Sequence, residues 1–230
     1  HYGREAAISS GAKLLPIKKV DELTLKKIES NLKSKKINIK KNVSWEDNKM
    51  NILIPMAGAG KRFADAGYVF PKPLIEIDNK PMIQWVIESL NFNANYIFII
   101  QKEHQEKYNI KSVLKILQPN CKIIELDHIT EGAACTTLLA KKFINNSDPL
   151  IIANSDQYIN WNSSKALYDF NSKNLDGAIL TFEAIHPKWS YAKCNDDGFV
   201  TEVAEKKVIS KNATVGVYYW KHGSDYVQSA

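Results

Sequence analysis

Short apolar runs alternate with amphipathic segments along the chain from residue 50 to residue 153. Four of these runs have the length and the bulky apolar composition of buried strands. They are residues 52–56, 96–100, 122–126 and 150–153. The segments between them carry apolar residues at helical spacing, at residues 82–90, 104–117 and 133–143. Strands of this kind alternating with helices are typical of a mostly parallel sheet that helices cover on both faces.

The pattern changes after residue 172, where strand-like runs follow one another with little helix between them. These runs are residues 178–184, 199–204 and 214–220. Residues 195–198 read Asn-Asp-Asp-Gly, which predicts the tight turn of a hairpin. We therefore predict an α/β protein with a Rossmann-like three-layer α/β/α fold, whose mostly parallel central sheet becomes mixed in its second half.

The beginning of the chain differs from the rest. We interpret residues 1–49 as a basic N-terminal appendage with one helix and residues 50–230 as the folded domain. Asp21 can cap a helix that runs to about Ser34. The chain starts with histidine, so the appendage is also compatible with the end of a fused domain.

The formal net charge of +6 lies entirely in the appendage. Residues 1–49 hold 12 basic and 6 acidic residues, whereas residues 50–230 hold 19 of each. A nucleic-acid partner is not expected, because the folded domain has no basic stripe. A membrane partner is not expected either, because no apolar run reaches the length of a membrane-spanning helix. The three cysteines have no metal-binding spacing, which favours free thiols in a cytoplasmic protein.

A glycine-rich, basic loop directly follows the first predicted strand. Residues 57–62 read Ala-Gly-Ala-Gly-Lys-Arg, and glycines let a backbone approach a phosphate closely. In an open α/β sheet, ligands bind at the carboxyl ends of the strands, where this loop lies. A P-loop would need glycine at Pro55 and a hydroxyl at Arg62, and the dinucleotide fingerprint would need glycine at Phe63. Neither motif matches. A bare Gly-x-Gly could equally be a tight turn between a strand and a helix, without any role in phosphate binding.

The wider segment resembles the signature of the sugar-nucleotide pyrophosphorylases, which are nucleotidyltransferases of the glucose-1-phosphate thymidylyltransferase type. The resemblance rests on Gly58-x-Gly60-x-Arg62-Phe63, then on Pro71-Lys72-Pro73-Leu74 and on its continuation through residues 75–90. Further segments resemble family landmarks in the same order, at residues 130–139, 150–159, 203–207 and 213–220. The resemblance implies a GT-A-like nucleotidyltransferase fold for residues 50–230.

The resemblance also implies a reaction, in which a nucleotidyl group passes from a nucleoside triphosphate to a phosphorylated sugar or polyol and pyrophosphate leaves. The implied catalytic residues are Arg62, Lys72 and Asp156, with Asp156 as the Mg²⁺ ligand. The implied nucleotide-binding residues are Met56, Ala57, Gly58, Ala59, Gly60, Lys61, Gln101, Glu131, Gly132 and Ala133. The implied acceptor-binding residues are Tyr191, Glu205, Lys206 and Gly216. Such a reaction needs positioning and charge neutralisation and no protein nucleophile.

Departures from the family pattern concentrate near the acceptor. Ala192 stands where the family often has a glycine after tyrosine, and Lys207 replaces a proline. These changes favour a non-standard acceptor and, with it, CTP over UTP or dTTP, in a pathway to surface or capsular polysaccharide. The family's second acidic metal ligand would fall after Ala230. A homo-oligomer is compatible with the resemblance.

Two other classes of protein remain as alternatives. A GT-A type glycosyltransferase would consume a nucleotide sugar, but such enzymes hold their metal with Asp-x-Asp and residues 154–156 read Asn-Ser-Asp. A non-catalytic nucleotide-sensing module would tolerate the loss of Arg62, Lys72 or Asp156, and all three are present. We therefore expect a nucleotidyltransferase.

Overall fold

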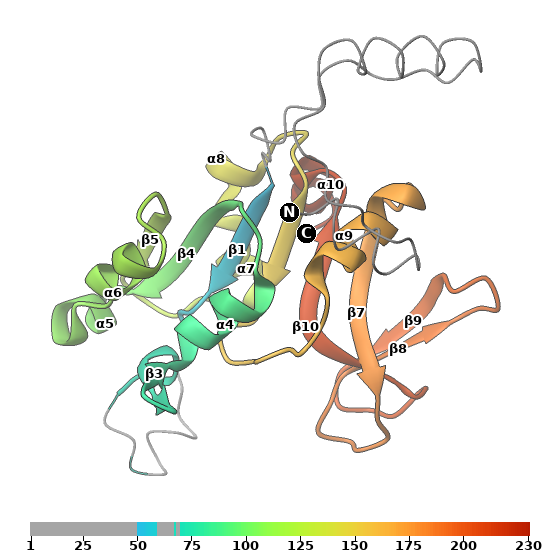
Figure 1. Cartoon of the computed structure of the whole chain (residues 1–230), viewed down its shortest axis with the longest axis horizontal. Coiled ribbons are helices and arrows are strands. Elements are labelled where there is room, and N and C mark those ends of the chain that lie inside the picture. Colours follow the sequence, from blue (N-terminus) through green and yellow to red (C-terminus); the bar gives the residue numbers. More distant parts are fainter. Residues whose placement is uncertain (1–49, 59–66, 68–69) are drawn as a thin grey trace, which may run out of the picture. The chain divides into compact units, whose positions relative to one another are not determined.

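The computed structural model describes residues 50–58, 67 and 70–230, and its elements are labelled as in Figure 1. The chain divides into two units, His1–Asn48 and Lys49–Ala230, and every described residue belongs to the second unit. The appendage and the helix predicted in it lie outside the described residues, and so do residues 59–62 of the glycine-rich loop.

An eight-stranded sheet forms the centre of the described unit, with the order β5-β4-β1-β6-β10-β8-β9 and with β7 paired to β10. Its strands are β1 (Asn51–Pro55), β4 (Asn95–Gln101), β5 (Lys122–Leu126), β6 (Leu150–Ala153), β7 (Gly177–Glu183), β8 (Tyr191–Cys194), β9 (Val200–Ala204) and β10 (Asn212–Trp220). β5, β4, β1 and β6 run parallel, whereas β10 runs antiparallel to β6, β7 and β8. The prediction of a parallel sheet that becomes mixed in its second half is confirmed.

Helices cover both faces of this sheet (Figure 1). One face carries α4 (Met82–Leu90), α6 (Ile110–Leu117) and α9 (Ser163–Ser172), and the other carries α7 (Ala133–Leu138), α8 (Lys141–Ile144) and α10 (Gly223–Ser229). Side chains of a strand point alternately to the two faces, so Ile52 and Ile54 join the first hydrophobic core and Leu53 joins the second. All three are fully buried. The predicted three-layer α/β/α fold is confirmed.

Two of the predicted helices are each divided in the structure. The segment 104–117 forms α5 (Lys102–Tyr108) and α6, because Asn109 adopts a left-handed conformation with φ 49°. Asparagine tolerates this conformation better than most residues, and Gln105 Oε1 accepts the N–H of Lys111 across the break. The segment 133–143 is likewise divided into α7 and α8, here without a left-handed residue, because Ala140 at the junction has φ −83° and ψ 4°. Apolar spacing continues across both breaks, so the pattern of the sequence did not show them.

A short turn and a small hairpin connect the glycine-rich loop with α4. η1 is a 3-10 turn at Lys72–Leu74, and β2 (Glu76–Ile77) pairs antiparallel with β3 (Lys80–Pro81). The hairpin turns through Asp78 and Asn79, whose φ angles of 50° and 62° are left-handed, as a two-residue turn between twisted strands requires. This connection keeps Lys72 close to the start of α4.

The second half of the sheet contains the predicted hairpin. The N–H of Asn195 donates to the carbonyl of Phe199 (2.9 Å), and the N–H of Gly198 donates back to the carbonyl of Asn195 (3.0 Å). The Asn-Asp-Asp-Gly turn between β8 and β9 is therefore confirmed.

Among the described residues, no helix combines the length and the apolar character that crossing a membrane demands.

Candidate active site

Three parallel strands end side by side and bring sequence-predicted residues to one edge of the sheet. β1 leads into Met56–Gly58, β4 ends at Gln101, and β6 leads to Asp156. Because β1 pairs in parallel with both β4 and β6, the carboxyl ends of the three strands meet at the same edge. Figure 1 shows β1 and β6 pointing toward the side of the molecule on which β3 lies.

Gln101 holds the start of the glycine-rich loop. Its Nε2 donates to the carbonyls of Ala57 (2.9 Å) and Gly58 (3.0 Å), while the N–H of Met56 donates to the carbonyl of Ile99 (2.7 Å). Met56 and Ala57 are buried, whereas Gly58 is exposed and a Cβ on it would meet no atom within 4 Å. The backbone at Gly58 thus borders open space. The other predicted loop residues, Ala59, Gly60, Lys61 and Arg62, lie outside the described residues.

Lys72 and Asp156 form an ion pair between Nζ and Oδ2. The structure thus brings together two of the three predicted catalytic residues. Their side chains are 32% and 26% exposed, so both charged groups remain in reach of solvent. An ion pair in such a position contributes little to stability and can open at low cost. Either group is therefore able to turn toward a phosphate or a metal ion that enters the site.

A bulge in β10 supports the backbone just before Asp156. β10 shifts its register against β7 at this point, and Gly216 within the shift has φ 74°. Its carbonyl accepts the N–H of Asn154 (2.9 Å). A Cβ on Gly216 would stand 2.1 Å from Asn154 Nδ2 and 2.7 Å from Gln157 Oε1. Glycine is therefore required here both by the left-handed backbone and by the close approach of the Asp156 segment.

Asn154 and Gln157 are site residues that the sequence analysis did not single out. They flank Asp156, and Asn154 Nδ2 donates to Gln157 Oε1 across it (3.4 Å). In the sequence, Asn154 stands where an Asp-x-Asp motif would have its first carboxylate. Their signal in the sequence was a cluster of polar residues directly after a buried strand, at the edge where ligands bind.

The segment before α7 carries the second group of predicted nucleotide-binding residues. Glu131, Gly132 and Ala133 are all exposed. The carbonyl of Gly132 accepts hydrogen bonds from Thr130 Oγ1 (3.1 Å) and Thr136 Oγ1 (3.1 Å). Gly132 has φ −169°, and a Cβ there would meet no atom within 4 Å. Neither the backbone nor the packing requires glycine at this position, and its surface is open to close approach by a ligand.

The predicted acceptor-binding residues differ in their access to a ligand. Tyr191 is fully buried, and its hydroxyl donates to the carbonyl of His186 (2.8 Å). Direct contact between Tyr191 and an acceptor does not fit this position, because the ring would have to leave the core. The hydrogen bond instead anchors the segment between β7 and β8. Glu205 and Lys206, in contrast, are exposed and form an ion pair with each other (2.9 Å).

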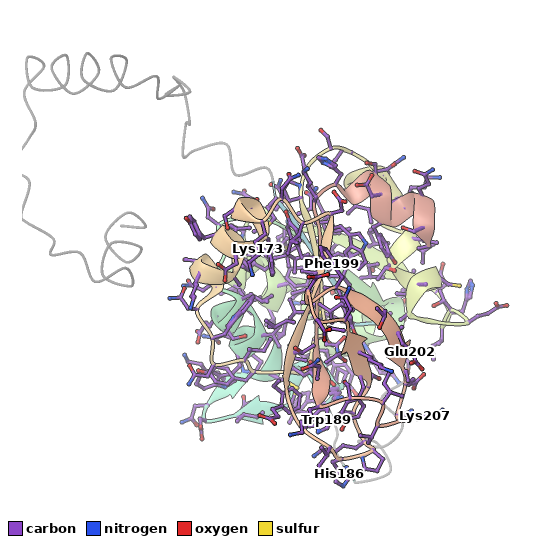
Figure 2. The ribbon with its side chains drawn as sticks, turned by 90° about the vertical axis from the view of Figure 1, so that its right-hand side faces the viewer. Lys173, His186, Trp189, Phe199, Glu202 and Lys207 are labelled. Atoms are coloured by element: carbon purple, nitrogen blue, oxygen red, sulfur yellow. The ribbon has the colours of Figure 1, made fainter. Side chains whose placement is uncertain are left out.

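The backbone at Lys206 has an uncommon conformation. Its φ of 52° is left-handed, which few residues other than glycine, asparagine and aspartate adopt. The hydrogen bond from Lys206 lowers the pKa of the Glu205 carboxyl. Figure 2 shows the neighbouring Lys207 at the same end of the molecule as His186 and Trp189. A strained backbone that presents charged groups is typical of functional loops.

The described residues fit a metal ion that protein and substrate share. Across residues 50–58, 67 and 70–230, no three His, Cys, Asp or Glu side chains gather as a metal site made of protein ligands alone. Mg²⁺ typically keeps several waters and binds through one or two carboxylates together with substrate phosphates. Asp156 supplies such a carboxylate, partly exposed and directly after β6.

Comparison with known proteins shows the family. The nucleotidyl transferase family matches residues 52–228, so the chain belongs to this family. A mannose-1-phosphate guanyltransferase from Aspergillus oryzae is 26% identical over 190 residues, which cover 74% of this chain and 49% of that protein. The bifunctional protein GlmU from Thermosipho melanesiensis is 29% identical over 180 residues, which cover 75% of this chain and 37% of that protein. The chain thus spans half or less of the length of these curated relatives.

Solved structures share the fold. A nucleoside-diphosphate-sugar pyrophosphorylase from Vibrio cholerae RC9 superposes with a TM-score of 0.63 at 24% identity, over 77% of this chain and 76% of that chain. A UDP-glucose pyrophosphorylase solved with UDP-glucose superposes with a TM-score of 0.59 at 18% identity, over 75% of this chain and 76% of that chain. The resemblance to sugar-nucleotide pyrophosphorylases, and the fold that it implied, are confirmed.

Proposed function

We propose that this protein transfers a nucleotidyl group from a nucleoside triphosphate to a phosphorylated sugar or polyol, with release of pyrophosphate. The Lys72–Asp156 ion pair carries the proposal, because it lies partly exposed beyond the carboxyl end of β6. The start of the glycine-rich loop and Gln101 border the same edge of the sheet. Family membership and the names of the relatives support this class of reaction.

In the proposed reaction, a phosphate oxygen of the acceptor attacks the α-phosphorus of the nucleoside triphosphate. The bond from the α-phosphorus to the oxygen bridging to the β-phosphorus breaks, and pyrophosphate leaves with that oxygen. Negative charge grows on the oxygens around the α-phosphorus, where the Lys72 ammonium would stabilise it. Arg62 would bind the β- and γ-phosphates with its planar guanidinium, and Lys206 would bind the acceptor phosphate.

Asp156 is the residue that we propose to hold Mg²⁺, which when bound would neutralise charge on the triphosphate oxygens. Asn154 and Gln157 keep the Asp156 segment against Gly216, so the carboxylate has a defined place at the end of β6. The Lys72 ammonium is able to move from Asp156 to a phosphate oxygen, because both side chains are partly exposed.

The identity of the nucleotide base and of the phosphorylated acceptor can be proposed in more detail. We propose CTP and a non-standard phosphorylated acceptor, because Ala192 and Lys207 depart from the family pattern around the acceptor. The relatives described above carry guanyl and UDP in their names, so other nucleotides belong in every test. We further propose that the protein is cytoplasmic, that it acts as a homo-oligomer, and that its product enters a pathway to surface or capsular polysaccharide.

A pyrophosphate-release assay with Mg²⁺ tests the proposal, with CTP, GTP, UTP and dTTP each combined with a panel of sugar and polyol phosphates. We expect release that requires both substrates and is fastest for one combination. Cleavage of a nucleotide sugar with release of the nucleoside diphosphate, and no pyrophosphate from any triphosphate, would favour the glycosyltransferase. Nucleotide binding without turnover in every combination would favour the sensing module.

A further inference from the structure

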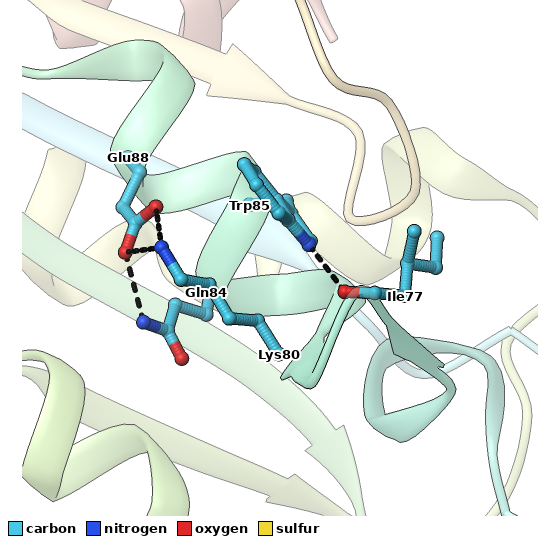
Figure 3. A network of polar contacts seen from close by, with 5 residues as sticks. All are labelled: Ile77, Lys80, Gln84, Trp85 and Glu88. Atoms are coloured by element: carbon cyan, nitrogen blue, oxygen red, sulfur yellow. Dashed lines mark hydrogen bonds and ion pairs between the residues drawn. The ribbon is translucent and has the colours of Figure 1, made fainter.

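The β2–β3 hairpin, which follows Lys72, is attached to α4 by a network of polar contacts (Figure 3). Trp85 Nε1 donates to the carbonyl of Ile77 (2.8 Å), and Lys80 Nζ pairs with Glu88 Oε2 (2.9 Å). The same Lys80 Nζ lies 4.7 Å from the centre of the Trp85 ring. Trp85 is thus bonded to one strand of the hairpin and contacted by a side chain of the other.

The hairpin continues directly from the turn that carries Lys72. The N–H of Ile75 donates to the carbonyl of Lys72 (3.3 Å), and the carbonyl of Ile75 accepts the N–H of Met82 at the start of α4 (2.9 Å). Ile77, the partner of the Trp85 indole, lies two residues further along. The place of the Lys72 backbone therefore depends on how the hairpin sits on α4.

A different part of Trp85 contacts the segment that carries Asp156. The rings of Trp85 and Tyr158 meet edge to face, with centroids 5.6 Å apart and planes at 89°. Tyr158 follows Asp156 by two residues and is 63% exposed. A side chain this exposed makes few contacts with the core. The contact with Trp85 therefore contributes much of what holds the Tyr158 ring in place.

We propose that Trp85 is a positioning residue that sets the relative places of Lys72 and Asp156. Its indole N–H binds the hairpin that follows Lys72, and its ring contacts the segment that contains Asp156. The ion pair between the two residues is partly exposed and therefore weak. A second set of contacts, through α4, is needed to hold the two side chains in a reactive geometry. The kinetic consequence of this inference rests on the proposed function, whereas its structural consequence does not.

Trp161 offers a matched control. Its Nε1 donates to the carbonyl of Ser89 (2.7 Å), and its ring meets that of Phe92 edge to face at 6.0 Å and 87°. Trp161 thus makes the same two kinds of contact as Trp85, but near the C-terminal end of α4 and not with the hairpin. A purely structural role for Trp85 predicts that both tryptophans respond alike to the same substitution.

Hydrogen–deuterium exchange of the full chain without substrate gives the first test. In Trp85→Phe we expect exchange to rise about fivefold in peptides that cover residues 72–77, the factor for one lost hydrogen bond. We also expect it to rise in peptides that cover residues 154–158, because the smaller ring, no longer fixed by Ile77, makes a poorer contact with Tyr158. Trp161→Phe should leave residues 72–77 unchanged. A rise in Trp85→Phe that is confined to residues 72–77, or an equal rise there in both variants, overturns the inference. This result stands whether or not the chain releases pyrophosphate.

Steady-state kinetics gives the second test once the wild type shows pyrophosphate release. We expect Trp85→Phe to lower kcat about tenfold while the KM for the nucleoside triphosphate changes less than twofold, because binding groups stay and only their alignment is lost. Tyr158→Leu should reproduce this split, whereas Tyr168→Leu, which removes a tyrosine that is 68% exposed on α9, should not. Equal kcat values in Trp85→Phe and Trp161→Phe would overturn the inference. A wild type without turnover counts against the proposed function, and the exchange data then decide on Trp85.

Discussion

Lys72 Nζ donates to Asp156 Oδ2, although the two residues are 84 positions apart in the sequence. One residue comes from the turn before α4, and the other follows β6. They meet because β1 and β6 are adjacent parallel strands and both connections leave from the same edge of the sheet.

Asp156→Asn is expected to lower the rate of pyrophosphate release about 10²-fold or more, because it removes the carboxylate that we propose to hold Mg²⁺. The melting temperature should change little, since a partly exposed ion pair of this kind contributes about 1 kcal/mol or less. Rate against Mg²⁺ concentration and a thermal melt measure both. Asp148→Asn, just before β6 at its opposite end, is the control. A variant that melts early but keeps its metal-dependent rate would remove Asp156 from the mechanism.

Gly216→Ala is expected to destabilise the protein by about 3 kcal/mol or more, for two reasons. The alanine would be strained in the left-handed backbone conformation, and its Cβ would collide with the side chains of Asn154 and Gln157. Gly198→Ala separates the two causes. Gly198 has φ 85°, but a Cβ there would meet no atom within 4 Å, so about 1–2 kcal/mol of backbone strain is expected alone. Urea unfolding of both variants measures the difference. Equal losses would show that the close approach at Gly216 does not matter.

Gln101→Leu is expected to raise the KM for the nucleoside triphosphate several-fold, because the carbonyls of Ala57 and Gly58 lose the donor that holds the start of the loop. Gln105→Leu is the control, since its two hydrogen bonds lie at the junction of α5 and α6. Initial rates at varied nucleotide concentration distinguish the variants. Equal KM values in Gln101→Leu and the wild type would argue against a role for this loop in nucleotide binding.

His104 is expected to make the free energy of unfolding depend on pH. Burial lowers the pKa of its imidazole from the ordinary value of 6.5, and Nδ1 is buried with no hydrogen-bond partner in the described part of the chain. The folded protein therefore binds this proton less readily than the unfolded chain, and the corresponding stability is present above pH 6.5 and lost as the pH falls below it. We expect His104→Leu to flatten the fall in unfolding free energy between about pH 7 and 5. The exposed His128, replaced by leucine, should leave that slope unchanged.

Arg62→Ala is expected to abolish pyrophosphate release without unfolding the protein. The prediction rests on the sequence, because Arg62 lies outside the described residues. Arg62→Lys should restore only part of the rate, since an ammonium keeps the charge but lacks the planar pair of donors that matches phosphate. Near wild-type release by Arg62→Ala would show that the loop has been assigned wrongly.

The sequence by itself determined the layers of the fold and the edge at which the site lies. Residues 122–126 and 150–153 are strands with the predicted bounds. The second of them is a short, unbroken apolar run, as a strand buried on both faces requires. Parallel strands place their carboxyl ends together, so the segments that follow β1 and β6 belong to one edge of the sheet whatever contacts they make there. Local pattern is sufficient for these features because burial and chain direction are properties of short segments.

The tertiary structure alone decided which side chains meet. It paired Lys72 with Asp156, pressed Gly216 against Asn154 and buried Tyr191, which the motif had placed at the acceptor. It also divided the segment 104–117 at Asn109, where apolar spacing gave no signal. The ion pair, the close approach at Gly216 and the burial of Tyr191 depend on contacts between segments far apart in the chain, and a motif records the order of residues but not the distances that packing sets between them.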